Sequence, residues 1–239
     1  MTVTYLYHSG FAVELEDTVL VFDYYKGRLP ETAAGKKLYV FSSHFHKDHF
    51  QREIFEWSEE YDATYILSKD IRAKGFEGTV HKVRGGEEIQ VDELKIKTLR
   101  STDVGVAFFV RLKGVSIYHA GDLNWWHWEE EGPAYNENMR VNYQREIGQI
   151  EGERIDLAFV PLDPRLGEAY GWGLDYFMKH TDTRHLFPMH LWGSYKTIRR
   201  FLEDGMSAGY RDKIVKIEKR QQKFELPGRG DGRKAEEEL

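Results

Sequence analysis

The sequence predicts an α+β fold in which two mostly antiparallel sheets pack face to face, with helices on both outer faces. Strand-like segments dominate the first half of the chain, and the expected helices stand between strands without alternating strictly with them, as they would around a parallel sheet. No internal repeat and no Pro/Ser-rich linker divides the 239 residues. We therefore expect a single domain over residues 1–226, because a chain of this length can bury one sizeable core.

The N-terminal segment is expected to form an antiparallel hairpin or meander. Apolar residues recur through residues 2–6, 11–15 and 19–23, and the polar run 16–18 supplies a turn between the last two. Residues 37–42 then form a short apolar run of the kind that is buried on both faces of a sheet.

The remaining elements follow from the spacing of apolar residues. Helices are expected at 50–61, 136–150, 174–179 and 195–202, where apolar residues recur at helical spacing. Further strands are expected at 64–67, 79–83, 88–91, 94–99, 106–112, 115–119, 155–162, 186–187 and 213–217. The tail at 227–239 has almost nothing to bury, so we expect it to be disordered.

The composition is ordinary for a globular protein and argues against several classes. Hydrophobic residues make up 41% of the chain, and the formal net charge of −6 disfavours a nucleic-acid surface, which usually needs a basic face. The chain has no cysteine, which excludes disulfides and thiolate ligands. The first ten residues do not resemble a signal peptide, and no window approaches the ~20 apolar residues of a membrane span. We expect a cytoplasmic protein without nucleic-acid or membrane partners, and the oligomeric state stays open.

The most informative motif comes directly after the strand at 37–42. The run His44-Phe45-His46-Lys47-Asp48-His49 contains three imidazoles and one carboxylate. Side chains at i and i+2 of an extended chain point the same way, so His44 and His46 can hold one metal ion. Asp48 and His49 follow the turn and are expected to face a second position nearby. Such ligands suit Zn²⁺, Mn²⁺ or Fe, and a paired site generates hydroxide at neutral pH.

Two further ligands are expected at strand ends downstream. The strand at 115–119 leads to Asp122, and a carboxylate can bridge two cations ~3.5–4 Å apart with one oxygen for each. We therefore predict that Asp122 is a bridging ligand; the alternative is an acid that only caps the turn. His190 follows another short strand and is predicted to join Asp48 and His49 at the second metal.

With these parts in this order, the chain resembles the metallo-β-lactamase-fold hydrolase superfamily, in particular its small lactonase-like branch. The resemblance covers most of residues 1–220. It implies an αββα sandwich with two divalent metal ions at one edge of the sheets, with Zn²⁺ as the first expectation and Mn²⁺ or Fe as alternatives. It also implies a metal-bridging hydroxide that attacks a small ester, lactone or similar carbonyl substrate, with Asp48 and Asp122 as the catalytic residues.

One departure from the superfamily concerns the first metal. The superfamily usually supplies a third His from a loop that corresponds to residues 99–105, and this stretch contains no His. Asp103 stands at the matching place, and a carboxylate oxygen can ligate Zn²⁺ or Mn²⁺. We therefore predict a first site of His44, His46, Asp103 and Asp122. The alternative is that Asp103 only hydrogen-bonds a ligand and that the first site is weak or empty.

Several other residues are candidates for the surroundings of the centre. Asp23 ends a strand and could orient a ligand His through its ring N–H, or be a solvated acid. His119 is expected in the core or behind a ligand. His8, in the first turn, could line the pocket, although a His in a turn is more typical of a merely polar position. Arg165 could meet an anionic substrate group, although alone it is typical of surface charge. Aromatic surface beside the metals is expected from Trp125, Trp126 and Trp128.

The sequence thus favours a binuclear metal-dependent hydrolase of a small molecule. A second interpretation is a phosphodiesterase acting on nucleotides or RNA, which would want a basic groove or a clamping insertion that the sequence does not show. A third is a degenerate, non-catalytic module that binds a metal or a ligand, and the missing third His is its only support. The acid that protonates the leaving group is not identifiable from the sequence.

Overall fold

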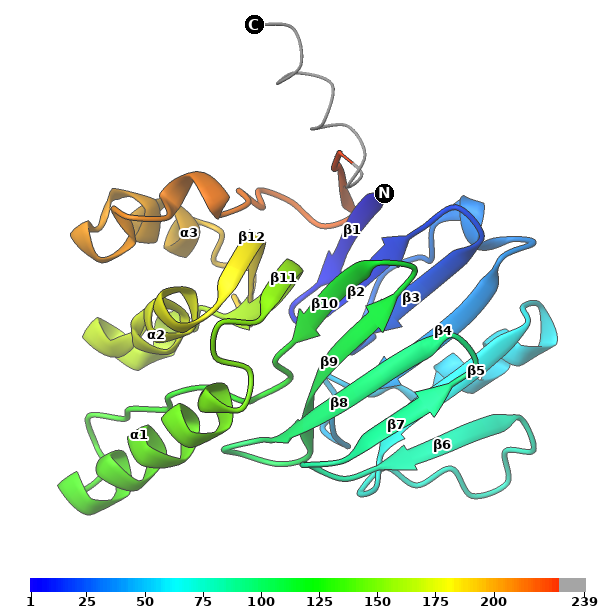
Figure 1. Cartoon of the computed structure of the whole chain (residues 1–239), viewed down its shortest axis with the longest axis horizontal. Helices are drawn as coiled ribbons and strands as arrows, with labels where there is room; N and C mark the ends of the chain where they lie inside the picture. The colour runs from blue at the N-terminus through cyan, green and yellow to red at the C-terminus, as the bar shows by residue number, and fades with distance from the viewer. Residues whose placement is uncertain (228–239) are drawn as a thin grey trace, which may run out of the picture.

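The computed structural model describes residues 1–227, and these residues form a sandwich of two mixed sheets with helices outside (Figure 1). One sheet has seven strands and the other has six. The α+β sandwich expected from the sequence is confirmed. The sheets are not mostly antiparallel, however, because each one joins an antiparallel part to a parallel part.

The first sheet is built largely from the N-terminal third of the chain. Its order is β13-β1-β2-β3-β4-β5-β6, in which β13 to β3 pair antiparallel and β3 to β6 pair parallel. The bounds are β1 (Thr2–Tyr7), β2 (Gly10–Glu14), β3 (Thr18–Phe22), β4 (Lys37–Ser42), β5 (Ala63–Ser68), β6 (Thr79–Val83) and β13 (Gln222–Glu225).

The second sheet has the order β12-β11-β10-β9-β8-β7. Strands β10, β11 and β12 run parallel, and β7 to β10 pair antiparallel. The bounds are β7 (Glu88–Val91), β8 (Leu94–Arg100), β9 (Val106–Leu112), β10 (Val115–His119), β11 (Arg154–Pro161) and β12 (Asp182–Met189).

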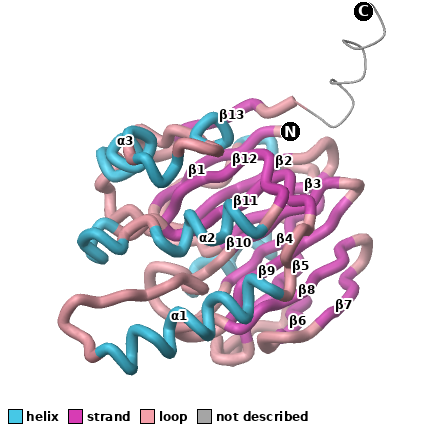
Figure 2. Tube along the Cα trace, turned by 60° about the vertical axis from the view of Figure 1, so that its left-hand side comes forward, coloured by secondary structure: helices cyan, strands magenta, loops and turns pink. Residues whose placement is uncertain are grey.

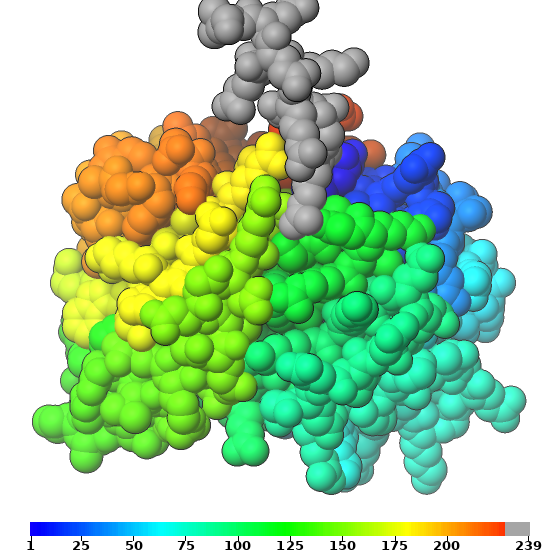
Figure 3. All heavy atoms as spheres, in the orientation of Figure 1, coloured from blue at the N-terminus to red at the C-terminus, as the bar shows by residue number. Residues whose placement is uncertain are grey.

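Helices cover the outer face of each sheet. Tyr118 of β10 stacks on Phe177 of α2 with ring centroids 4.8 Å apart, and on the first sheet Tyr65 of β5 donates a 2.7 Å hydrogen bond to the carbonyl of Ile54 in η2. The α-helices gather on one side of the molecule, which the space-filling view shows in orange to yellow-green (Figure 3). Their bounds are α1 (Pro133–Gly148), α2 (Trp172–His180) and α3 (Lys196–Glu203); the 3₁₀ turns are η1 (Glu31–Ala33), η2 (Arg52–Glu59), η3 (Pro164–Ala169), η4 (Gly205–Ser207) and η5 (Arg211–Lys213).

The core between the sheets is rich in phenylalanine. Phe11 and Phe22 of the first sheet meet Phe159 of the second at ring-centroid distances of 4.3 and 6.0 Å, and all three are fully buried. Each buried ring of this kind contributes about 3–5 kcal/mol relative to alanine. The two sheets therefore meet through buried aromatic contacts, which include Phe22, the last residue of β3.

The last part of the chain differs from the sequence expectation. Residues 213–217 do not form a strand; only a single bridge joins Ile214 to Leu186. The final strand is instead β13, which pairs with β1 and lies beside it in Figure 2. Val215 and Ile217 gave an alternating pattern, but Ile217 packs into the core from an irregular segment. The tail expected to be disordered lies, apart from Pro227, outside the described residues.

One helix expectation and one strand expectation also change in detail. The helix expected over residues 50–61 is the shorter 3₁₀ segment η2. The short strand expected at 186–187 is the inner part of β12, which spans Asp182–Met189 because it is paired along its whole length with β11. Among residues 1–227, none of the helices has the length and apolar character needed to cross a membrane.

The topology brings five strand ends to one edge of the sandwich. Strands β3 and β4 are parallel in one sheet, and β10, β11 and β12 are parallel in the other. The residues that follow these strands are Asp23, the segment 43–49, Asp122, Asp163 and His190. Because carboxyl ends of parallel strands meet at one edge, residues far apart in sequence converge there.

Candidate metal centre

The segment that carries the histidine motif is fixed by backbone contacts at the end of β4. The backbone N–H of Ser43 donates to Oδ1 of Asp23 at 2.7 Å, and its carbonyl accepts from the N–H of Val106 at 3.0 Å. The N–H of Phe45 donates to Oδ2 of Asp70 at 2.8 Å. The loop is therefore held between both sheets, which fixes the directions of the histidine side chains on either side of Phe45.

The first group of ligand atoms comprises His44, His46 and Asp122. One ligand atom from each lies within 4.8 Å of the others, and the rings of His44 and His46 are 4.6 Å apart. His44 and Asp122 are buried and His46 is half-buried. The structure thus brings together three of the four residues predicted for the first metal.

The second group comprises His8, Asp48, His49 and His190, again with ligand atoms within 4.8 Å of one another. Three of these were predicted from the sequence, whereas His8 was regarded as a polar turn residue. His8 adopts a left-handed backbone conformation (φ 59°) between β1 and β2, its Nε2 lies 3.3 Å from Oδ2 of Asp48, and its carbonyl accepts the N–H of His190. The only sequence signal was a His at a strand end, a position it shares with His190.

Asp122 stands between the two groups. Its Oδ1 lies 3.2 Å from Nε2 of His49 and 3.4 Å from Nε2 of His190, whereas its Oδ2 lies 3.5 Å from Nε2 of His44. One carboxylate oxygen therefore faces each group, which is the geometry that a bridging ligand requires.

Buried hydrogen bonds behind the ligands determine which ring nitrogen faces the centre. The hydroxyl of Ser43 donates to Asp23 at 2.6 Å and so accepts from Nδ1–H of His44 at 2.9 Å. Nδ1 of His49 lies 2.7 Å from Oδ2 of Asp23, and Asp23 is fully buried. We assign the proton to Nδ1 of both rings from these contacts, which leaves the Nε2 lone pairs directed at the centre.

His190 is oriented in the same way by a residue that the sequence did not reveal. Its Nδ1 lies 2.8 Å from Oδ2 of Asp163, which also accepts from Nε (3.0 Å) and Nη2 (2.6 Å) of Arg165. Burial opposes the charge of Asp163, but the hydrogen bonds from His190 and Arg165 prevail and lower its pKa to about 2. The available signal was an acid directly after a strand, the same pattern as Asp23.

The donor set fits metal ions on a test that uses only the protein atoms. Within the described residues, four buried atoms that face the centre have no hydrogen-bond partner: His8 Nε2, His44 Nε2, His49 Nε2 and Asp122 Oδ1. Buried polar atoms without partners cost about 1–3 kcal/mol each, so a cluster of them implies a missing partner. Imidazole nitrogens and carboxylate oxygens are ligands that Zn²⁺, Mn²⁺ and Fe accept.

The electrostatics agree with ligation. Burial is the main cause that lowers the pKa of His8 and of His44 to about 4, so both rings are neutral at pH 7 and can donate a lone pair. Burial opposes ionisation of Asp122, but His49 and His190 outweigh it and hold its pKa well below the usual range. Conversely, Asp122 and Asp23 raise the pKa of His49 despite its burial. Without a cation, this favours a second proton on Nε2 of His49, toward Asp122; a bound cation would replace that proton and leave the Nε2 lone pair as a ligand.

The structure does not place Asp103 in either group of ligand atoms. Its backbone N–H donates to the hydroxyl of Ser101 at 3.1 Å, in an exposed turn that ends at Gly105. Its side chain lines a cavity of about 280 Å³ beside Asp122 and His190. Desolvation, followed by the charge of Asp122, raises the pKa of Asp103. In this conformation the first group comprises three residues, and Asp103 lines the cavity beside it.

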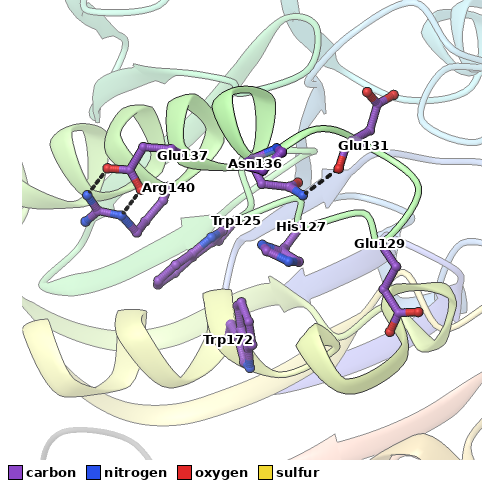
Figure 4. A pocket seen from close by; sticks show the side chains of 9 residues that line it. Trp125, His127, Glu129, Glu131, Asn136, Glu137, Arg140 and Trp172 are labelled. Atoms are coloured by element: carbon purple, nitrogen blue, oxygen red, sulfur yellow. Dashed lines mark hydrogen bonds and ion pairs between the residues drawn. The ribbon is translucent and has the colours of Figure 1, made fainter.

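The aromatic side chains that follow Asp122 face two different cavities in turn. Trp126 and Trp128 line the cavity of about 280 Å³ beside Asp122 and His190, which we call the metal cavity. The two rings stack on each other, with ring centroids 6.0 Å apart. Trp125, expected beside the metals, instead lines a neighbouring cavity of about 470 Å³ with His127 and Trp172 (Figure 4). Successive side chains of this segment therefore line opposite cavities.

His119 belongs to the core rather than to the cavity. Its Nε2 lies 2.8 Å from the carbonyl oxygen of Ser9, its Nδ1 accepts from the N–H of Gly121 at 3.1 Å, and its ring stacks on Phe22. Burial lowers its pKa. His119 therefore ties the end of β10 to the first turn of the chain.

The fold and the paired His/Asp groups define a metal-binding sandwich of the metallo-β-lactamase type. Residues 2–132 match the family model described as "Beta-lactamase superfamily domain", and the chain belongs to this family. A protein of Opitutus terrae named "UPF0173 metal-dependent hydrolase" is 31% identical over 144 residues, which are 51% of this chain and 63% of that protein. The chain thus spans less than two thirds of the length of this relative.

Solved structures show the same fold at low sequence identity. Igni18, a metallo hydrolase from Ignicoccus hospitalis, superposes with a TM-score of 0.62 at 19% identity, covering 95% of this chain and 100% of that one. YhfI, a metallo-beta-lactamase fold protein from Bacillus subtilis, also gives a TM-score of 0.62, at 15% identity, with 94% and 99% covered.

Proposed function

We propose that the protein is a metal-dependent hydrolase whose binuclear centre cleaves a small ester, lactone or similar carbonyl compound. The observation that carries the proposal is the position of Asp122, which turns one carboxylate oxygen toward each of two groups of unpartnered ligand atoms. The name of the Opitutus relative, a metal-dependent hydrolase, supports the same class of activity.

His44, His46 and Asp122 would hold the first ion, and His8, Asp48, His49 and His190 would hold the second, with Asp122 shared. Zn²⁺ is the first expectation because imidazoles dominate both groups, with Mn²⁺ or Fe as alternatives. When bound, such a pair lowers the pKa of water, polarises a carbonyl oxygen and stabilises the negative charge that develops on it.

The residues of the chain supply orientation and proton transfer. Asp48 is only partly buried, with 23% of its side chain exposed, and its pKa is low because His8 and His49 outweigh the cost of burial. It is therefore ionised, so it can orient an attacking water by accepting a hydrogen bond from it and can take up its proton transiently. In the overall reaction the water oxygen bonds to the carbonyl carbon, the ester C–O bond breaks, and the proton leaves with the alcohol.

The size of the cavity supports a small substrate. The space beside Asp122 and His190 is about 280 Å³ and is walled by Trp126, Trp128 and Met139. Pockets for drug-sized ligands start near ~300 Å³, so a compact molecule with a flat apolar part fits best.

The proposal is tested by metal content and activity on one preparation, purified without chelator or affinity nickel. We expect about two Zn, Mn or Fe ions per chain by elemental analysis, and hydrolysis of an aryl acetate or a γ-lactone. Asp122→Asn should lower kcat at least ~100-fold, the scale of losing several kcal/mol of charge stabilisation. The control is Asp17→Asn, an exposed acid paired with Lys113.

Other outcomes identify the competing functions. Hydrolysis of bis(4-nitrophenyl) phosphate but not of the carbonyl esters would make the protein a phosphodiesterase. Two bound ions without turnover of either class would indicate a non-catalytic binding module. Fewer than two ions, unrecovered on adding metal, would contradict the binuclear centre.

A further inference from the structure

One positively charged side chain, that of Arg165, lies in the wall of the metal cavity. Arg165, at the start of η3, lines this cavity together with Asp122 and His190, and 47% of its side chain is exposed. Of the titratable groups that line the cavity, it is the only one that carries a fixed positive charge. An arginine there faces the position that a substrate would occupy beside the second group of ligands.

The guanidinium is only partly used by the protein. Its Nε and Nη2 donate to Asp163 at 3.0 and 2.6 Å, which fixes the plane of the group. Within the described residues its Nη1 has no hydrogen-bond partner. A guanidinium held by one carboxylate retains donors in a fixed geometry for a second oxyanion.

Aromatic rings frame the same cation. The guanidinium carbon of Arg165 lies 5.6 Å from the ring centroid of Trp128, inside the cavity, and 4.8 Å from that of Trp192. Trp192 is 45% exposed, an unusual state for so large an apolar side chain, and its ring is 4.4 Å from that of His8. A flat apolar group could therefore lie against Trp192 or Trp128 while an anionic group meets Arg165.

Two more cation–aromatic pairs continue this arrangement on the His8 side. Nζ of Lys26 lies 4.3 Å from the ring centroid of Tyr25, which is 6.4 Å from the ring of His8. The guanidinium of Arg220 lies 4.6 Å from the ring centroid of Tyr7. Two exposed cations therefore lie over the rings that neighbour His8, in a chain with a formal net charge of −6.

The carboxylates near Arg165 do not cancel its positive charge evenly across the cavity. Asp48 and Asp122 belong to the ligand groups, where cations would neutralise them, and Asp163 is already paired with Arg165. Asp103 remains as an opposing charge in the cavity wall. An anionic group is therefore favoured at the Arg165 end and disfavoured at the Asp103 end, which gives a bound substrate one orientation.

We propose that the substrate carries an anionic group, a carboxylate or a phosphate, next to a flat apolar part, and that Arg165 selects it by binding this group beside His190. This inference rests on the proposed hydrolase function and names the substrate class of that same site. Arg165 is a specificity residue here and takes no part in bond cleavage. The competing explanation is that Arg165 only holds Asp163 in place behind His190.

Matched esters separate the two explanations. The metal-loaded protein is assayed with 4-acetoxybenzoate, 4-acetoxyphenyl phosphate and the neutral methyl 4-acetoxybenzoate. A charge-assisted hydrogen bond corresponds to roughly 10–100-fold, so we expect the wild type to favour at least one anionic ester by about that ratio of kcat/KM. Whichever ester is favoured distinguishes carboxylate from phosphate recognition.

The variants test whether Arg165 is responsible. Arg165→Gln should bring the ratio of anionic to neutral ester close to one, and Arg165→Lys should retain part of it. The control is Arg111→Gln, because Arg111 is also half-exposed, paired with an acid (Glu153, 2.8 Å) and over an aromatic ring (Phe109, 4.5 Å), but on β9 away from the centre. It should keep the wild-type ratio.

Two results would overturn the proposal. A wild-type ratio near one excludes charge selection, and an equal loss on all three esters in Arg165→Gln means that Arg165 acts only through Asp163 and His190. If the wild type hydrolyses none of the esters, the hydrolase proposal fails separately. Binding is then measured by quenching of tryptophan fluorescence with 4-hydroxybenzoate and its methyl ester: a preference for the anion that Arg165→Gln removes supports anion binding, and no preference refutes it.

Discussion

Asp23 and His49 are joined by a 2.7 Å hydrogen bond between Oδ2 and Nδ1, in a position where neither side chain is exposed to solvent. The same carboxylate accepts the backbone N–H and the hydroxyl of Ser43, so every bond it makes supports a residue of the candidate centre. It therefore orients two ligand rings at once, His49 directly and His44 through Ser43.

We expect Asp23→Asn to weaken metal binding about 10–100-fold, because an amide cannot accept from all three donors and loses the charge that fixes the ring orientations. Asparagine tolerates the left-handed backbone of this residue (φ 42°), so the change isolates the carboxylate. Chelator competition measures the affinity. The control is Asp92→Asn, which is also left-handed (φ 50°) and bonded to a hydroxyl, that of Tyr39. Equal affinities for both variants would refute the orienting role.

His8 provides the second prediction. His8→Asn should keep the turn between β1 and β2, because asparagine accepts a positive φ, but should remove one nitrogen ligand from the second group. We expect the second ion to bind at least ~10-fold more weakly while the first ion is retained. Metal titration followed by elemental analysis resolves the two. His81→Asn, on β6, is the control, and unchanged binding of two ions in His8→Asn would exclude His8 as a ligand.

The third prediction concerns Asp103, for which the sequence and the structure suggest different roles. If it ligates the first metal, Asp103→Ala should release that ion. From its place outside both groups we expect the metal content to stay unchanged. The expected effect is instead on substrates, because removing this charge from the cavity wall should raise the affinity for anionic esters a few-fold. Loss of one ion per chain would restore the four-ligand first site predicted from the sequence.

Gly105 tests the close contact beneath the histidine motif. A Cβ there would overlap the carbonyl oxygen of Ser43 and lie 2.6 Å from Cβ of His44, at φ +79°. We expect Gly105→Ala to lower the free energy of unfolding by more than ~2 kcal/mol, from steric overlap added to the backbone strain. Gly86→Ala is the matched control, because Gly86 has φ +84° and open space around it. Similar midpoints of urea unfolding would contradict the steric argument.

Much of the fold could be predicted because local pattern and tertiary packing agree. The apolar run Lys37–Ser42 is a central strand, and the residues after it reach the centre because they extend from a fixed strand end. The strand β13 could not be predicted in this way: Gln222–Glu225 alternates between half-buried and exposed, and only its pairing with β1 makes it a strand.

The residues of the candidate site also divide into those that the sequence pattern could predict and those that it could not. For residues close together in sequence, such as His44 and His46, the spacing alone predicts a common role. His8 and Asp163 could not be recognised in this way, because each meets its partner only through tertiary packing. His8 contacts Asp48, which lies 40 positions away, and Asp163 contacts His190, which lies 27 positions away. Asp103 shows the opposite limit, since its place in the sequence was right for a ligand but its turn directs it toward the cavity.

The ligand groups draw on both sheets: His8 and the histidine motif follow strands of the first, and Asp122 and His190 follow strands of the second. An ion shared by such residues is a cross-link between the two halves of the sandwich. Its binding free energy also opposes their separation, since ions that bind only the folded state stabilise it by about 2.7 kcal/mol at one hundred times Kd. Any opening wide enough to part the sheets releases the ions, so activity should disappear before the strands themselves unfold.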